Sequence, residues 1–172
     1  MRCLLPILSI LCIASSYGQD ELVMYGVFKD HETQKPSSGT VAIHRIEDGS
    51  VAFDTSITRN GKYKIVIPYE GSFLVVFKGE GLTKSSVMID THVYPEEVKR
   101  GGFGFMVDMV FLREVEGVDY TPITSRPSRS VIWDAPLKRF NFDTTYYGEY
   151  ESEFERVLAL HKARKKELKQ NR

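Results

Sequence analysis

Short runs of β-branched and aromatic residues, separated by turn signals, fill residues 21–112 of this chain. The turns recur about every 8 to 12 residues, which is typical of an antiparallel sandwich, and helical periodicity is absent. Asn60 and Gly61 give the strongest turn signal, because a tight hairpin needs positive φ angles that these residues adopt with little strain. The pattern predicts seven strands, at residues 22–28, 40–46, 51–57, 62–67, 72–78, 83–90 and 103–112.

Residues 103–112 form the most apolar of these runs, with large side chains on both faces of the predicted strand. Asp108 lies among them, and an unpaired carboxylate would be costly to bury there. We expect Asp108 to pair with a base, accept backbone hydrogen bonds or reach a sheet edge, as a structural rather than a catalytic residue. Because such a run aggregates readily when it is uncovered, another part of the chain should cover it.

Residues 113–147 combine three prolines with several aromatic side chains. Prolines favour extended or turn conformations, and aromatic rings supply apolar area that can pack on a sheet. We therefore predict an ordered arm that wraps the sandwich, with short added strands at residues 131–133 and 139–142. The alternative is an exposed aromatic surface that binds a ligand.

The chain ends in a predicted amphipathic helix, residues 148–172. Glutamates crowd its start and lysines and arginines its end, which suits the helix dipole. One stripe at helical spacing is a packing face and a candidate surface for binding a partner. It consists of Tyr150, Phe154, Val157, Leu158 and His161.

The first residues have the order of a secretory leader. Arg2 provides a basic start, residues 3–14 are an apolar run, and small residues at positions 16 and 18 precede the polar segment that begins at Gln19. A membrane-spanning helix needs roughly 20 apolar residues, so an uncleaved anchor is the less favoured alternative. We predict a signal peptide at residues 1–18 and an exported protein located in the periplasm, at the outer membrane or outside the cell.

Loss of this leader would limit the chemistry of the mature chain. Both cysteines, Cys3 and Cys12, lie in it, so neither a disulfide nor a thiolate metal site is expected. The 23 basic and 23 acidic residues balance, which argues against nucleic acid as a partner. No second apolar run approaches membrane length, so we expect no transmembrane segment in the mature chain.

No residue pattern predicts an active site. His31 and Glu32 begin like a zinc-protease motif, but Lys35 occupies the position of the second histidine. The histidines show no ligand spacing, no G-x-S-x-G elbow is present, and the glycine-rich turns lack a phosphate-loop lysine. We expect no catalytic residue, no cofactor and no metal. The four histidines are His31, His44, His92 and His161.

Several segments together resemble the carboxypeptidase regulatory-like domain. The resemblance covers residues 22–90 and is carried by residues 25–30 (YGVFKD), 33–36 (TQKP), 60–63 (NGKY) and 79–84 (GEGLTK), with Val41. It implies a seven-stranded antiparallel transthyretin-like or Ig-like sandwich. In that family the module is non-catalytic and occurs beside peptidases, on outer-membrane receptors and in small exported proteins of Gram-negative envelopes. Residues 91–103 and 140–146 are similar, more loosely, to tails of such envelope proteins.

The expected organisation is a signal peptide (1–18), a sandwich (19–112), a wrapping arm (113–147) and a C-terminal helix (148–172). The expected function is that of a non-catalytic envelope protein that binds another envelope protein through the helix. The first alternative is a module that binds a glycan by stacking exposed aromatic rings, for which the candidates are Tyr69, Trp133 and Tyr147. A hydrolase with an unrecognised site is a third hypothesis. It is weakened because the tyrosine-arginine-glycine-serine ending of the hydrolases related to transthyretin is absent.

Overall fold

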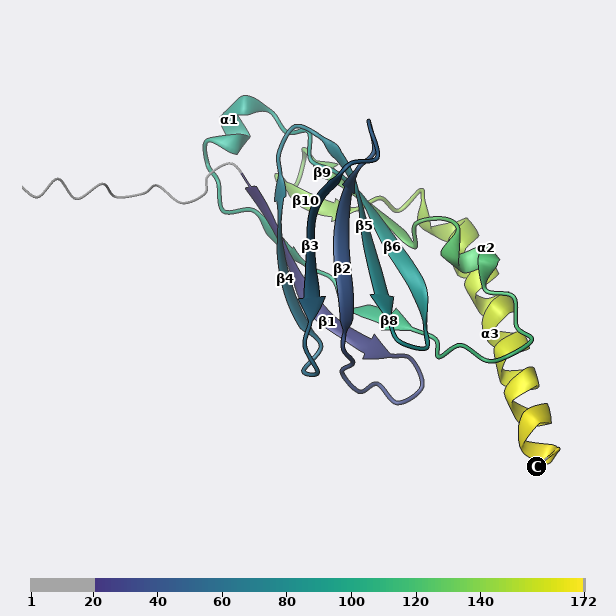
Figure 1. The fold of residues 1–172 in the computed structure, drawn as a ribbon. Helices are drawn as coiled ribbons and strands as arrows, with labels where there is room; N and C mark the ends of the chain where they lie inside the picture. Colours follow the sequence, from purple (N-terminus) through teal and green to yellow (C-terminus); the bar gives the residue numbers. More distant parts are fainter. Residues whose placement is uncertain (1–20, 172) are drawn as a thin grey trace, which may run out of the picture.

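The computed structural model describes residues 21–171, apart from the side chain of Tyr147. It confirms a mainly β protein in which two sheets form a sandwich and a long helix ends the chain (Figure 1). The predicted signal peptide lies outside the described residues. Within the described chain, no helix is both long and apolar enough to cross a membrane.

The larger sheet has six strands in the order β10–β9–β6–β5–β2–β3. Neighbouring strands are antiparallel except β6 and β9, which run parallel. The strands are β2 (Gly39–Arg45), β3 (Val51–Ile57), β5 (Ser72–Gly79), β6 (Leu82–Asp90), β9 (Arg129–Asp134) and β10 (Arg139–Phe142).

The smaller sheet is built on the first strand, β1 (Glu21–Asp30). It pairs antiparallel with β4 (Lys62–Pro68) on one side. On its other side it pairs in parallel with two short strands, β7 (Gly104–Met106) and β8 (Met109–Phe111). The six strands predicted before residue 91 are therefore confirmed to within two residues at each end.

The seventh predicted strand, residues 103–112, is wrong as a single antiparallel strand. It is split at Val107 and Asp108, and both halves run parallel to β1, so residues 21–112 contain eight strands rather than seven. The backbone N–H of Val27 donates to the Asp108 side chain at 3.0 Å, in place of a main-chain carbonyl. A Cβ on Gly26 would lie 1.9 Å from the Val107 carbonyl oxygen, so this close crossing requires glycine.

Aromatic rings fill the centre of the core between the sheets. Phe28 of β1 stacks on Phe111 of β8 with ring centroids 4.1 Å apart, and Phe77 of β5 packs on the same ring. In β4 the buried residues alternate with exposed ones, as the period of two predicts for Tyr63, Ile65 and Ile67. Phe77 of β5 therefore covers the Phe111 end of the apolar run.

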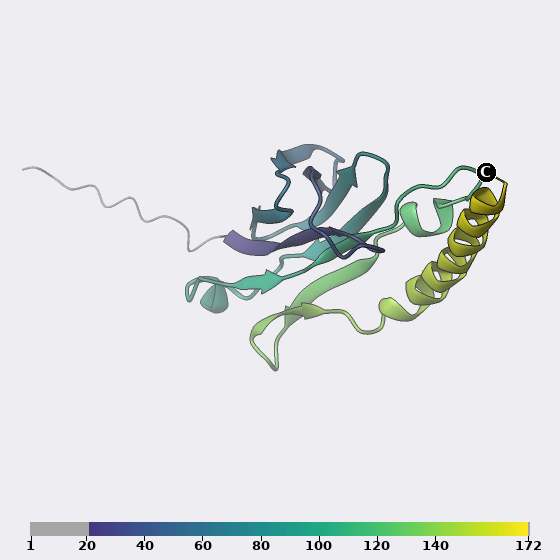
Figure 2. The same cartoon turned by 90° about the horizontal axis from the view of Figure 1, so that it is seen from below.

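The predicted added strands of the arm are confirmed as β9 and β10, which extend the larger sheet as a hairpin. Trp133 and Phe140 of this hairpin pack edge-on against Phe103 and cover that end of the apolar run. The helices are α1 (Pro95–Val98), α2 (Thr121–Thr124) and α3 (Tyr147–Gln170). Figures 1 and 2 both place α1 and α3 at opposite ends of the sandwich.

We predict that Phe111→Ala lowers the free energy of unfolding by about 3–5 kcal/mol, because it leaves a cavity beside Phe28. The control Val110→Ala alters a neighbouring side chain that is 37% exposed and should change it by less than about 1 kcal/mol. Urea unfolding followed by circular dichroism measures both values. Equal losses in the two variants would show that the buried Phe111 ring does not stabilise the core between the sheets.

Candidate functional site

The predicted stripe of α3 packs against the chain itself. Val157 is fully buried and His161 is only 1% exposed, so a separate protein cannot reach either side chain. The stripe is therefore a packing face, and its assignment as a surface for a partner is corrected for these two residues. Tyr150, Phe154 and Leu158 are partly buried in the same cluster, which also contains Leu112, Val118, Tyr120 and Ile123.

A buried hydrogen-bonded group fixes α3 to two other parts of the chain. The Nδ1 atom of His161 lies 2.8 Å from the Tyr120 hydroxyl oxygen, and its Nε2 atom lies 3.0 Å from a carboxylate oxygen of Glu32. The backbone N–H of Val115 donates to the Tyr120 oxygen, which leaves the phenol proton available to His161. Lys165, one turn further along α3, pairs with the second oxygen of Glu32. We call Glu32, Tyr120, His161 and Lys165 the helix latch.

The electrostatics of the latch favour an ionised Glu32. Hydrogen bonds from Lys165 and then from His161 lower the pKa of the Glu32 carboxyl below its ordinary value. Burial raises the pKa of the Tyr120 phenol. Both shifts keep these groups in the charge states that the hydrogen bonds need near neutral pH.

The latched helix forms one wall of a cleft of about 280 Å³ at the edge of the sandwich. We call it the helix cleft. Its residues come from the loop after β1, from β6 and β8, from the start of β9 and from α3. They are His31, Gln34, Ser85, Asp108, Met109, Val110, Ser128, Arg129, Tyr150 and Phe154.

The loop that carries His31 is built rigidly. The Asp30 carboxylate accepts the backbone N–H groups of Glu32 and Thr33 at 2.9 and 3.0 Å and pairs with Arg113 at 3.1 Å. These bonds hold the loop in a tight turn. His31 is thereby placed against Phe154 of α3, with ring centroids 5.8 Å apart.

The predicted pairing of Asp108, which lies in the cleft wall, is confirmed. Asp108 pairs with Lys29 and accepts the backbone N–H of Val27. The hydrogen bond from Lys29 is the main reason that the pKa of the Asp108 carboxyl is lowered. Its charge is therefore already compensated within the chain.

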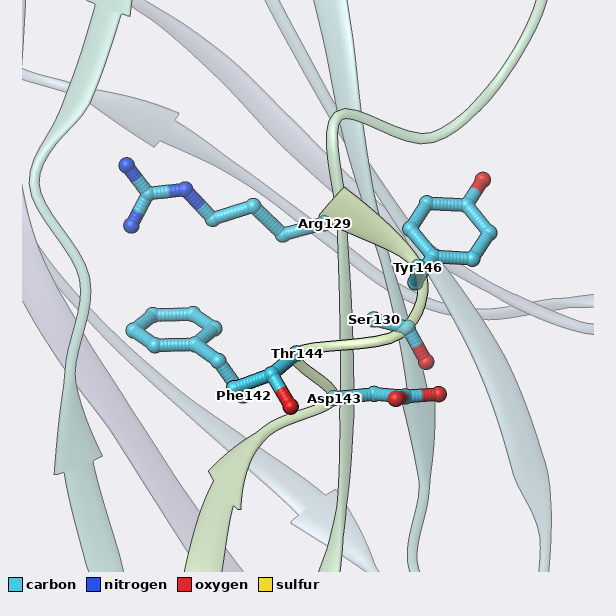
Figure 3. Close-up of a pocket in the computed structure, with 6 residues that line it drawn as sticks. All are labelled: Arg129, Ser130, Phe142, Asp143, Thr144 and Tyr146. Carbon is cyan, nitrogen blue, oxygen red and sulfur yellow. The ribbon is translucent and has the colours of Figure 1, made fainter. Parts of the chain in front are cut away.

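Arg129 has a different environment. Among the described residues, no carboxylate lies within ion-pair distance of its guanidinium, which instead sits 4.8 Å above the ring centre of Phe142. Arg129 also lines a second cleft of about 280 Å³ with Ser130, Phe142, Asp143, Thr144 and Tyr146 (Figure 3). We call this second space the hairpin cleft, and Arg129 is the residue that the two clefts share.

The residues predicted to stack on a glycan do not form one exposed site. Tyr69 is buried and stacks on Phe140, with ring centroids 6.4 Å apart and 7° between the ring planes, so its assignment to a glycan surface is wrong. Trp133 is half-buried and contacts Phe103 and Phe140, and it lines a separate depression with Tyr94. Tyr147 begins α3, but its side chain lies outside the described residues.

No group of three or more histidine, cysteine, aspartate or glutamate side chains in residues 21–171 could hold a metal ion. Two of the four histidines pair with carboxylates, His161 with Glu32 and His92 with Asp90. Sequence reasoning missed Arg129 and the helix cleft altogether. No local signal marks them, because the cleft is assembled by the pairing of β6 with β9 and by the docking of α3.

No family model matches the sequence, and no curated protein matches it. The structure is similar to the catechol 1,2-dioxygenase of an Acinetobacter species, with 15% identity, a TM-score of 0.38 and coverage of 66% of this chain and 57% of the enzyme. The catechol 1,2-dioxygenase of Acinetobacter radioresistens has 12% identity and a TM-score of 0.41, with coverage of 64% of this chain and 57% of the enzyme. A Bacteroides uniformis protein provisionally assigned as carbohydrate-binding has 13% identity and a TM-score of 0.34, with coverage of 52% of this chain and 40% of that protein. The chain thus spans little more than half the length of these dioxygenases.

These similarities correct the expected function. Most of the similar structures are dioxygenases, including a hydroxyquinol 1,2-dioxygenase of Pseudomonas putida. The expected function of a non-catalytic envelope module is therefore wrong. Identities of 10–15% assign no dioxygenase activity to this chain.

The helix latch generates a prediction about stability. Tyr120→Phe removes the hydroxyl that serves both His161 and the Val115 N–H, and it should lower the free energy of unfolding by about 1–3 kcal/mol. The control Tyr94→Phe removes a hydroxyl from a side chain that is 60% exposed and should leave stability unchanged within about 0.5 kcal/mol. Chemical unfolding of both variants measures these free energies. If Tyr120→Phe leaves stability unchanged, the helix latch does not stabilise the fold as predicted.

A second prediction concerns acid. Because the folded-state pKa of Glu32 is lowered, its stabilising effect is present above the ordinary value of 4.5 and is lost as pH falls through the lowered value. We expect Glu32→Gln to be less stable than the parent near neutral pH and to lose less further stability between about pH 5 and pH 3. The control is Glu151→Gln, an exposed α3 carboxylate without an ion pair among the described residues. The free energy of unfolding is measured as a function of pH for each variant. If the curves of the parent and Glu32→Gln are parallel, ionised Glu32 does not stabilise the fold as predicted.

Proposed function

We propose that this protein binds a small organic ligand in the helix cleft. One observation carries this proposal: the cleft is lined by two groups that the chain leaves available for a ligand. Among the described residues, the imidazole of His31 makes no hydrogen bond and the guanidinium of Arg129 makes no ion pair. Polar groups that converge on a cleft without partners of their own are the usual anchors of a bound molecule.

The composition of the cleft wall supports this function. Tyr150, Phe154 and Met109 provide apolar area, while Ser85 and Ser128 place hydroxyls at its base. The two hydroxyl oxygens lie 3.2 Å apart, and Ser128 donates to the Ser86 carbonyl at 2.9 Å. A wall that combines apolar side chains with fixed polar groups suits a small molecule, and the volume of about 280 Å³ lies just below the usual range for such sites.

Two expectations from the sequence stand beside this proposal. Export through residues 1–18 and membership of residues 22–90 in the carboxypeptidase regulatory-like family remain proposals. Both fit a domain that meets its ligand outside the cytoplasm. Neither is needed for the helix cleft to bind, because the cleft is formed by residues of the described chain.

A fragment screen by protein-observed NMR tests the proposed function. We expect neutral or charged fragments to shift the signals of His31 and Tyr150, and Val110→Trp to weaken their binding at least about 10-fold by filling the cleft, a loss of about 1.4 kcal/mol. The matched control is Val66→Trp on β4, since Val66 is 39% exposed and Val110 is 37% exposed. If no fragment of any charge shifts these signals, or if Val110→Trp binds as well as Val66→Trp, the proposed function fails.

A further inference from the structure

We propose that the ligand is a small organic carboxylate, with its anionic group bound by Arg129 and its apolar body lying along Phe142 and Tyr146 of the hairpin cleft. This inference rests on the function proposed above, adds the chemical class of the ligand and extends the ligand from the helix cleft past Arg129 into the hairpin cleft. Arg129 lines both clefts, so a molecule held by its guanidinium can extend from one cleft into the other.

The charged groups that line the two clefts differ in their partners. Asp108 in the helix cleft is neutralised by Lys29. Asp143 in the hairpin cleft accepts the backbone N–H and the hydroxyl of Thr145 at 2.9 and 2.6 Å, and these bonds lower the pKa of its carboxyl. Both carboxylates are thus committed to other groups, whereas Arg129 has no carboxylate partner among the described residues.

The guanidinium of Arg129 is held in a fixed orientation. Arg129 begins β9 where that strand pairs with Val87 of β6, and its side chain is half-buried. Figure 3 shows its side chain and that of Phe142 extending to the same side, away from Asp143 and Ser130. A guanidinium that stacks on a ring keeps its in-plane N–H groups free for a carboxylate, which it can bind through two parallel hydrogen bonds.

The apolar surface beside the guanidinium favours an organic anion over a bare inorganic one. Phe142 is 36% exposed although it lies on the inner face of the sheet, where it pairs in register with the buried Val131. The Tyr146 hydroxyl donates to the Pro127 carbonyl at 3.1 Å, which fixes this ring as a wall of the hairpin cleft. A flat apolar group would cover these rings and gain the free energy of removing them from water.

Isothermal titration calorimetry on the full chain tests this class of ligand with three probes: cinnamate, its neutral analogue cinnamamide, and inorganic phosphate. We expect cinnamate to bind at least about 10-fold more tightly than cinnamamide or phosphate, because only cinnamate offers both the charge and the apolar body. Arg129→Gln should remove the preference for cinnamate over cinnamamide, and Arg129→Lys should restore part of it. Phe142→Leu should weaken the binding of cinnamate but keep the preference for cinnamate over cinnamamide.

The matched control is Arg139→Gln, an exposed arginine of β10 that lines neither cleft and should behave as the parent. Thermal unfolding of every variant shows whether it folds, and Phe142→Leu tests the site without removing a charge. Equal binding of cinnamate and cinnamamide, a preference that persists in Arg129→Gln, or no binding of cinnamate overturns the carboxylate inference. The proposed function fails separately, when the fragment screen finds no ligand of any charge in the helix cleft.

Discussion

The carboxylate of Asp108 holds the strand edge on which both the sandwich and the helix cleft depend. By accepting the Val27 N–H it replaces a carbonyl of the ladder, and by pairing with Lys29 it keeps its charge compensated at that edge. At the same place the Val107 carbonyl crosses close to Gly26, and the run that begins at Gly104 pairs with β1 in two short pieces instead of one long strand. The second piece, β8, carries Phe111 into the core and presents Met109 and Val110 to the cleft.

The helix latch holds α3 by hydrogen bonds and an ion pair, whereas the sandwich is held by apolar packing. An amphipathic helix held by apolar contacts alone can slide along its groove with little change in buried area, whereas His161 has hydrogen-bond partners in one position only. Glu32 lies next to His31 in the chain, so the same loop fixes the helix and lines the cleft. The position of Phe154 against His31 therefore follows from the latch.

Local patterns were sufficient to predict most strands and the final helix. The alternation of Tyr63, Ile65 and Ile67 and the turn at Asn60 depend on neighbouring residues only, and the structure reproduces them. The break at Val107 could not be predicted, because it depends on the close approach of Gly26 from a distant strand. A carboxylate within an apolar run did predict that Asp108 is paired, and the structure shows this pairing. The sequence did not predict the cleft beside it.

The two clefts, like the break at Val107, could not be predicted because they depend on distant parts of the chain. Parallel pairing of β6 with β9 brings together residues that share no local sequence pattern. A structural alternative for Arg129 is protection of a sheet edge, where charged side chains prevent pairing with other chains. That alternative fits Arg129 poorly. The guanidinium of Arg129 lies over the ring of Phe142 in β10, and β10 itself pairs with residues 131–134 of β9. A half-buried guanidinium without an acidic partner is available to pair with an anion, as the proposed carboxylate ligand requires.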